Sequence, residues 1–258
     1  MVADAASPGS ITTSARRAPT RKGAMLYDAS RLSNADESLF DVKFWLADAA
    51  TARTPGGRGA ALFIEHIGQA WVLRHYQRGG FVARLTADRY LWTGENRTRA
   101  FREWRLLCEL RQQGLPVPAP IAARYVRHGL SYRGDLITER ISGAQPVSAL
   151  LAGAPLPLST WRAIGHCIRQ LHEHGVWHAD LNAHNILVAA PERVSLVDFD
   201  RARRRAPGPW REANLARLER SLNKICRELP AERFTPRDWA ALRAGYDSGS
   251  AGAGQLRP

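Results

Sequence analysis

The segment that decides the fold is His178-Ala-Asp-Leu-Asn-Ala-His-Asn185, followed closely by Val197-Asp-Phe-Asp200. Asn185 stands five residues after Asp180, and Asp198 stands eighteen residues after it. The first segment follows a predicted helix, and the second ends an apolar run with strand character. Flanking apolar residues would place both acids at the ends of buried elements, facing a cleft. The ordinary alternative for either acid is a solvated loop residue or a helix cap.

The spacing of the two segments matches the protein-kinase signature H-x-D-L-x-x-x-N followed by D-F-G. Phosphoryl transfer builds negative charge on the transferred oxygens, so the protein mainly positions the reactants and neutralises charge. We therefore predict that Asp180 is the catalytic base for the attacking hydroxyl. Asn185 and Asp198 are predicted to bind Mg²⁺, which bridges the phosphates of ATP. His178 is expected to brace the catalytic loop, the segment 178–185, as a hydrogen-bonded histidine.

The order of the predicted elements separates a β-rich half from a helical half. Between about residues 40 and 92, short apolar runs alternate with glycine turns, which indicates a small antiparallel sheet. One helix is predicted at 99–113, and two further strands extend to about residue 141. Three helices are predicted in the second half, at 159–175, 215–229 and 235–242.

This order predicts an α+β, protein-kinase-like two-lobed fold. Residues 1–24 are expected to form a flexible leader, because they are rich in Ala, Ser, Thr and Arg. Residues 25–140 would form an N-lobe that contains the small antiparallel sheet and one helix. Residues 141–258 would form a reduced, mostly helical C-lobe with the catalytic and metal-binding loops and the acceptor site.

The first half also carries candidate nucleotide-binding residues. Gly57 and Gly59 precede a strand and could lay backbone N–H groups over phosphates, although glycine clusters usually form only turns. Arg74 occupies the place of the lysine in the V-A-I-K strand of kinases, keeps the positive charge and can bind phosphate oxygens with its planar fork. Glu103, on the following helix, is the natural partner of Arg74, with a solvated helix acid as the plainer alternative.

Composition restricts the partners and the compartment. Lys and Arg total 37 against 24 acidic residues, a net charge of +13 that favours anionic partners unless an arginine-rich coding bias explains it. The three cysteines are widely spaced and form no CxxC pair, which suits a reducing compartment. No secretory signal is visible, and prolines interrupt the longest uncharged stretch, residues 141–161. A cytoplasmic protein is therefore predicted, and peripheral contact with a membrane is compatible with the sequence.

Several segments together resemble the bacterial lipopolysaccharide kinase family. They are the two catalytic segments and three segments of the first half, Gly57-Arg-Gly-Ala-Ala61, Trp71-Val-Leu-Arg-His-Tyr-Gln-Arg-Gly-Gly80 and Arg102-Glu-Trp-Arg105. The likeness covers about residues 38–230. Within the family, the Arg-His-Tyr-x-Arg-Gly-Gly run is most similar to the members that act on 3-deoxy-D-manno-octulosonic acid (Kdo).

The resemblance implies a reaction and a location. ATP, with Mg²⁺, would phosphorylate the 4-hydroxyl of a Kdo sugar attached to a lipid A precursor. That anionic glycolipid lies at the cytoplasmic face of the bacterial inner membrane, so the protein would act there as a peripheral protein on an anionic surface. A basic chain suits such an acceptor. No protein partner is inferred.

Departures from ordinary protein kinases agree with a small acceptor. Asn182 stands where a lysine commonly follows the base, and Asp200 replaces the glycine of D-F-G. The activation segment is reduced to Arg201-Ala-Arg-Arg-Arg205, which would either bind acceptor phosphates or remain solvated.

Two other interpretations stay open at the level of sequence. One is a different small-molecule kinase, such as a heptose or aminoglycoside kinase, which would share Asp180, Asn185 and Asp198. The other is a pseudokinase or basic binding module, which Arg74 in place of lysine keeps possible. Nucleic acid is not an expected partner, because no RNP-like strand, zinc knuckle or helix-turn-helix is recognisable.

Overall fold

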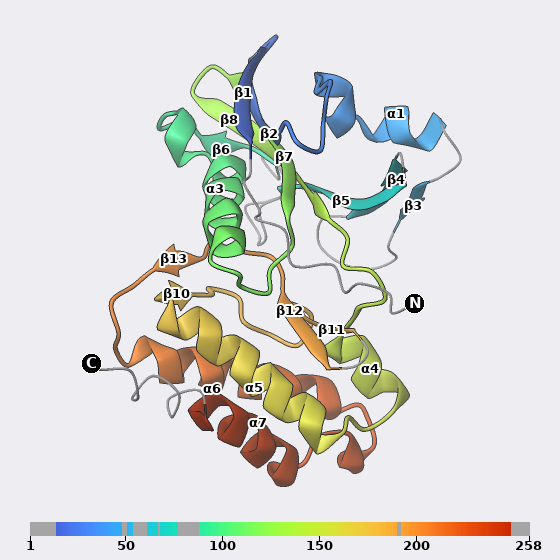
Figure 1. Ribbon diagram of the computed structural model, residues 1–258, viewed down its shortest axis with the longest axis vertical. Helices are drawn as coiled ribbons and strands as arrows, with labels where there is room; N and C mark the ends of the chain where they lie inside the picture. Colours follow the sequence, from blue (N-terminus) through green and yellow to red (C-terminus); the bar gives the residue numbers. More distant parts are fainter. Residues whose placement is uncertain are drawn as a thin grey trace, which may run out of the picture. The chain divides into compact units, whose positions relative to one another are not determined.

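The structure, a computed structural model, describes residues 14–47, 51–53, 61–66, 68–76, 88–189 and 192–248 (Figure 1). The chain divides into two units. The first comprises residues 1–114 and 119–139, and the second comprises residues 115–118 and 140–258.

An antiparallel sheet forms the centre of the first unit. Its strands are β1 (Ala15–Thr20), β2 (Gly23–Asp28), β3 (Thr51–Arg53), β4 (Leu62–His66), β5 (Gln69–His75), β6 (Tyr90–Leu91), β7 (Pro120–His128) and β8 (Ser131–Glu139). The strand order is β1-β2-β7-β8-β5-β4-β3, and β6 pairs with β8. Each pair is antiparallel. The neighbours β1-β2, β4-β5 and β7-β8 are consecutive in the chain and joined by short turns, whereas β2-β7 and β5-β8 bring together strands that are far apart in sequence.

Helical segments cover this sheet and close its core. They are η1 (Glu37–Phe40), α1 (Val42–Ala47), η2 (Glu95–Arg97) and α3 (Arg99–Gln112). Helix α3 packs against β7 and β8, and its ring contact between Phe101 and Tyr125 joins helix to sheet. Phe40 and Trp45 of the segment formed by η1 and α1 join the buried cluster that includes Trp71 of β5. The helix expected at 99–113 is thus confirmed.

The prediction of a flexible leader at residues 1–24 is wrong for residues 15–20 and 23–24, which lie in strands. Residues 15–20 form β1 and residues 23–28 form β2, in a register that pairs Ala15 with Asp28. β1 is an edge strand with mostly exposed side chains, so it carries no apolar alternation for sequence reasoning to detect. Residues 1–13 lie outside the described part of the chain.

The second unit is mostly helical. Its helices are α4 (Val147–Gly153), α5 (Leu158–Glu173), α6 (Trp210–Cys226), η3 (Ala231–Arg233) and α7 (Pro236–Ser248). Its short strands are β9 (Gln145–Pro146), β10 (Val176–Trp177), β11 (Ile186–Ala189), β12 (Arg193–Leu196) and β13 (Arg203–Arg204). They form a β12-β11-β9 sheet and a separate β10-β13 pair. Of the helices described here, none is long and apolar enough to cross a bilayer.

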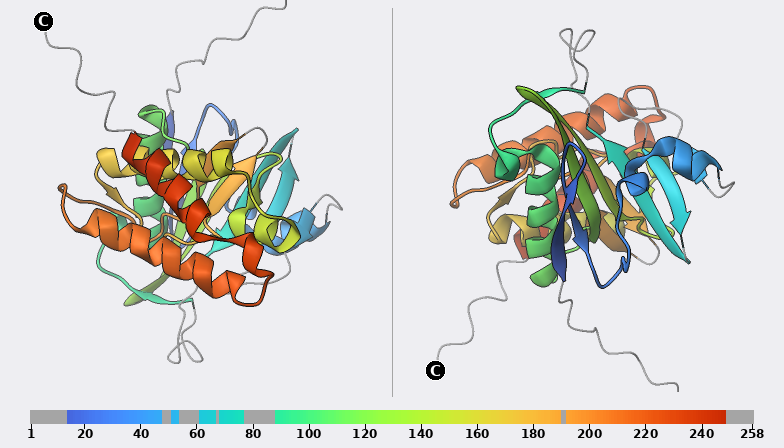
Figure 2. Two further views of the ribbon diagram at one scale, coloured as in Figure 1. Left: turned by 90° about the horizontal axis from the view of Figure 1, so that it is seen from below. Right: turned by 90° about the horizontal axis from the view of Figure 1, so that it is seen from above.

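Two glycines let α5 and α7 approach each other closely (Figure 2). A Cβ atom on Gly165 of α5 would lie 2.0 Å from the carbonyl oxygen of Leu242, and one on Gly245 of α7 would lie 2.1 Å from that of Arg162. Any side chain at either position would collide with the backbone of the other helix. This packing fixes α5, which leads through β10 into the segment 178–185.

Candidate active site

The β11–β12 hairpin brings the two motif segments together. Ile186 pairs with Leu196 in the antiparallel register, and the N–H of Val197 donates to the carbonyl oxygen of Asn185 at 3.0 Å. Asn185 immediately precedes β11, and Asp198 comes just after β12. Because the strands are antiparallel, both residues emerge at the same end of the hairpin.

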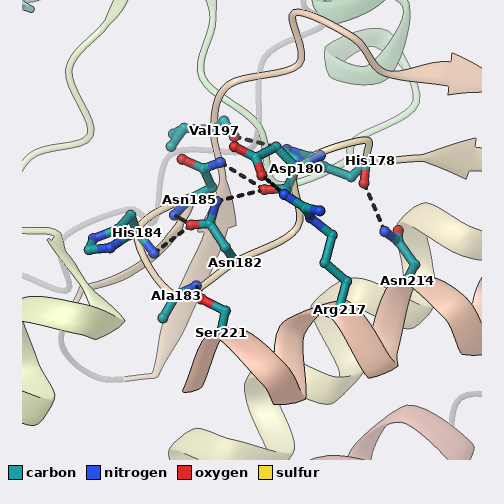
Figure 3. Close-up of polar contacts among 10 residues, drawn as sticks. All are labelled: His178, Asp180, Asn182, Ala183, His184, Asn185, Val197, Asn214, Arg217 and Ser221. Atoms are coloured by element: carbon teal, nitrogen blue, oxygen red, sulfur yellow. Dashed lines mark hydrogen bonds and ion pairs between the residues drawn. The ribbon is translucent and has the colours of Figure 1, made fainter. Parts of the chain in front are cut away.

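His178 joins the two segments at their centre. Its Nε2 lies 3.0 Å from the carbonyl oxygen of Val197, and its Nδ1 accepts the N–H of Asp180 at 3.3 Å (Figure 3). The ring also packs edge-on against Phe199, with centroids 4.9 Å apart. Burial lowers the pKa of His178, which favours the neutral ring that this pattern requires, with one nitrogen donating and the other accepting. The histidine therefore has the bracing role expected from the sequence.

Two amide side chains hold the turn that follows Asp180. Asn182 and Asn185 both donate through Nδ2 to the carbonyl oxygen of Asp180, at 3.0 and 2.8 Å. The Oδ1 of Asn182 accepts the backbone N–H groups of His184 and Asn185, at 2.8 and 3.2 Å. Asn182, at the usual lysine position, thus stabilises the loop. Since Nδ2 of Asn185 is engaged, its Oδ1 is the atom that remains for a ligand.

The carboxylate of Asp180 is half exposed and forms an ion pair with Arg217 of α6. Sequence reasoning missed Arg217, because the residue lies on a later helix beside the apolar stripe and matches no motif. The only signal in the sequence was its position off the stripe Leu215, Leu218 and Leu222, which placed it on a polar face. The structure therefore adds a cation next to the predicted base.

Asp198 has a left-handed backbone conformation, with φ of +66°. This region costs a residue with a side chain on the order of 1 kcal/mol and is often found at functional sites. An amide oxygen from Asn185 and a carboxylate from Asp198 are the hard oxygen donors that Mg²⁺ prefers. The residues at this end of the hairpin therefore fit a magnesium ion.

A buried chain of hydrogen bonds connects the segment 178–185 to the helices of the second unit. The hydroxyl of Tyr246 lies 2.8 Å from Nδ1 of His172, whose Nε2 lies 3.1 Å from Oδ1 of Asn214. The Nδ2 of Asn214 donates to the carbonyl oxygen of His178 at 2.8 Å. Burial lowers the pKa of His172 to about 4. The chain links α7, α5, α6 and the catalytic loop, and no sequence motif indicated it.

In the first unit, Arg74 and Glu103 form the ion pair expected from the sequence. Glu103 is 1% exposed, and its second carboxylate oxygen accepts the hydroxyl of Tyr76 at 2.5 Å. A buried carboxylate without such partners would carry a large desolvation cost. Gly57 and Gly59, the other candidate nucleotide-binding residues, lie outside the described residues.

His75, which lies between Arg74 and Tyr76 in the chain, has a separate buried partner. Its Nδ1 lies 2.6 Å from Asp135, which also accepts two hydrogen bonds from Arg124, at 2.9 and 2.8 Å. The hydrogen bond with Asp135 raises the pKa of His75. Each side chain of Arg74, His75 and Tyr76 therefore contacts a buried carboxylate.

The basic run 201–205 makes structural contacts at its C-terminal end. Arg204 donates to the carbonyl oxygen of His174, and the guanidinium of Arg205 lies 3.9 Å from the ring centroid of Trp177. These contacts accompany the pairing of β13 with β10. Two of the arginines considered as phosphate ligands are thus engaged within the unit.

Comparison with known proteins finds a family model, similar sequences and a similar solved structure. A family model described as "Lipopolysaccharide kinase (Kdo/WaaP) family" matches residues 42–246. Proteins named 3-deoxy-D-manno-octulosonic acid kinase are similar over 228 residues. The one from Xylella fastidiosa strain 9a5c is 45% identical, and the match covers 88% of this chain and 90% of that relative. The one from Stenotrophomonas maltophilia strain K279a is 46% identical, and the match covers 87% of this chain and 90% of that relative. A looser structural likeness is to the bifunctional kinase-methyltransferase WbdD, with a TM-score of 0.45 and 19% identity over 78% of this chain and 45% of that one.

Proposed function

Because this chain belongs to the lipopolysaccharide kinase (Kdo/WaaP) family, we propose that it is an ATP-dependent kinase of 3-deoxy-D-manno-octulosonic acid in lipopolysaccharide core biosynthesis. The proposed acceptor group is the 4-hydroxyl of Kdo on a lipid A precursor. The observation that carries the proposal is the loop in which Asp180 is fixed by His178, Asn182 and Asn185.

Asp180 is the proposed base. Hydrogen bonds to its backbone N–H and carbonyl groups fix the residue, while its carboxylate remains half exposed and accessible to a hydroxyl. The carboxylate would accept the hydroxyl proton as the new P–O bond forms and the bond to ADP breaks. Arg217 lies against the carboxylate and holds its side chain at the surface of the loop, where the acceptor would approach.

Asn185 and Asp198 are the proposed residues for magnesium. When bound with ATP, the ion would neutralise charge on the phosphates. The protein's part is to orient one amide oxygen and one carboxylate at the same end of the β11–β12 hairpin, the first through the hydrogen bond from Nδ2 of Asn185 to Asp180.

Arg74 is the proposed phosphate ligand of the first unit. Its pairing with buried Glu103 holds the guanidinium in a defined orientation, as the lysine of a kinase strand is held by its glutamate. Gly57 and Gly59 remain predicted backbone donors to the phosphates. The lipid acceptor and the net charge of +13 support a peripheral position on the anionic cytoplasmic face of the inner membrane.

Transfer of labelled phosphate from ATP tests the proposal. The acceptor panel should contain Kdo-bearing lipid A precursors, heptose-bearing cores and aminoglycosides. We expect transfer to the Kdo acceptors only, and Asp180→Ala should lower the rate by roughly 10²- to 10⁴-fold, the usual contribution of a positioned base. Stability should change little, since exposed ion pairs contribute at most about 1 kcal/mol. Glu232→Ala, a change of an exposed acid in the same unit, is the matched control. An active Asp180→Ala variant would contradict the assignment of the base.

A further inference from the structure

A basic cleft lies beside the catalytic loop, and we propose that it binds the phosphate groups of the acceptor lipid. The cavity has a volume of about 820 Å³, within the size range of ligand pockets. Its walls come from α4, from the catalytic loop at Asn182 and His184, and from α6. All its lining residues belong to the second unit. The inference rests on the proposed function and adds to it the place where the acceptor is held.

The wall contributed by α6 and the residue after it is strongly cationic. Arg217, Arg220, Lys224 and Arg227 line the cleft, with Glu228 as the one acid among its lining residues. Successive cations in this series are three or four positions apart, so on the helix they are neighbours on one face. Like charges at this spacing repel one another weakly, and a bound anion would relieve that repulsion. Phosphate oxygens are the anionic groups that arginine forks bind best.

Three of these cations have no ionic partner among the residues that the structure describes. Arg220, Lys224 and Arg227 are exposed, and none of them forms an ion pair with another described residue. Arg204 and Arg205 of the basic run 201–205 are instead occupied by contacts with the backbone and with a tryptophan ring. Arg201 and Arg203 of that run are exposed as well, but they do not line the cleft, so the α6 cations are the ones placed to bind an anion there.

The cleft is joined directly to the predicted base. Arg217 extends from the cleft wall and pairs with Asp180, as Figure 3 shows. Ser221, one turn further along α6, accepts the backbone N–H of Ala183 at 3.3 Å, so the helix and the loop are linked at a second point. Asn182 is fixed by its three hydrogen bonds within the loop. A phosphate bound by Arg220 and Lys224 would thus place the rest of the acceptor next to a carboxylate whose position is already set.

The test is a double variant, Arg220→Gln with Lys224→Gln, assayed with a diphosphorylated Kdo-bearing acceptor. Loss of two charge-assisted contacts should raise KM for that acceptor roughly 10- to 100-fold. KM for ATP and kcat should stay within about twofold, because the hydrogen bonds that hold the catalytic loop come from other residues. The matched control is Arg193→Gln with Arg237→Gln, which removes the same charge from exposed positions of the same unit outside the cleft.

The outcomes separate this inference from the proposed function. An unchanged KM in the α6 double variant, or an equal rise in the control, overturns the cleft. A defect of the same size on a dephosphorylated acceptor overturns the assignment to phosphate and points to the sugar carboxylate. If the wild type fails to phosphorylate any Kdo acceptor, the proposed function falls. In that case the cleft is tested by measuring how tightly the protein binds the diphosphorylated lipid, without phosphate transfer. The inference stands only if the double variant binds this lipid more weakly than the wild type does.

Discussion

Acidification should destabilise the second unit through His172, the buried histidine that links α5 to the catalytic loop through Asn214. Burial is the main cause that lowers its pKa from 6.5 to about 4, and the charges of Arg211 and Arg169 act in the same direction. The hydrogen bond with Asn214 opposes these effects without cancelling them. The folded protein therefore holds His172 neutral at a pH where the unfolded chain already binds a proton.

The sign and the size of the effect follow from this difference. The stabilising contribution is complete above pH 6.5, the pKa of the histidine in the unfolded chain, and it is lost as the pH falls toward the folded pKa of about 4. A tenfold difference in proton affinity between the two states corresponds to about 1.4 kcal/mol, so we expect a loss of roughly 3 kcal/mol from this residue between pH 7 and pH 4. That loss is a large share of the stability of an ordinary domain.

The assay compares the wild type with His172→Gln, which keeps a donor and an acceptor but does not titrate. Urea unfolding of both proteins would be followed at pH 7, 6, 5 and 4. The wild type should lose about 3 kcal/mol more than the variant over this range. His178, whose pKa is also lowered by burial, is present in both proteins, so its contribution cancels in the comparison.

A direct measurement accompanies the unfolding series. Nuclear magnetic resonance of histidine-labelled protein should show the ring of His172 titrating near pH 4, well below 6.5. A titration near 6.5, or equal losses of stability in the two proteins, would refute the reasoning that this buried chain of hydrogen bonds holds the histidine neutral.

Two further changes test other parts of the molecule. Arg74→Ala should mainly weaken ATP binding, measured as nucleotide affinity. The double variant with Glu103→Gln should be made as well, because it does not leave a buried carboxylate without its ionic partner. An unaltered nucleotide affinity would remove Arg74 from the site. Gly165→Ala should lower the free energy of unfolding by roughly 1–3 kcal/mol or more, because the new Cβ would overlap the carbonyl oxygen of Leu242. Gly153→Ala is its control, since a Cβ there meets no atom within 4 Å, and equal stabilities of the two variants would contradict the packing argument.

Much of the fold is encoded in local sequence patterns. Helical spacing of apolar residues located α3, α5 and α6, and alternation with glycine turns located β4 and β5. Short or exposed elements escaped prediction. The edge strand β1 buries too little to show alternation, and α1 and α4, with six and seven residues, are too short for a helical period to be recognised.

The candidate site was predictable where its chemistry lies within a motif. Asp180, Asn185 and Asp198 stand at fixed spacings in two short segments, and Arg74 and Glu103 stand at expected positions on a strand and a helix. The pairing of Arg74 with Glu103 is confirmed, and the hairpin places Asn185 and Asp198 at one end. The chemical roles of these residues stay predictions for the assays above.

By itself, the sequence determined which residue types can do phosphoryl-transfer chemistry and the order in which they occur, because motif spacing and apolar periodicity are properties of neighbouring residues. Only the tertiary structure decided that Arg217 meets Asp180, that His172 and Asn214 support the catalytic loop, and that the cations of α6 line a cleft. These contacts join segments that lie far apart in the chain. They depend on which face each helix presents when the core packs, and the free energy that selects this arrangement is shared among all the buried side chains of the unit.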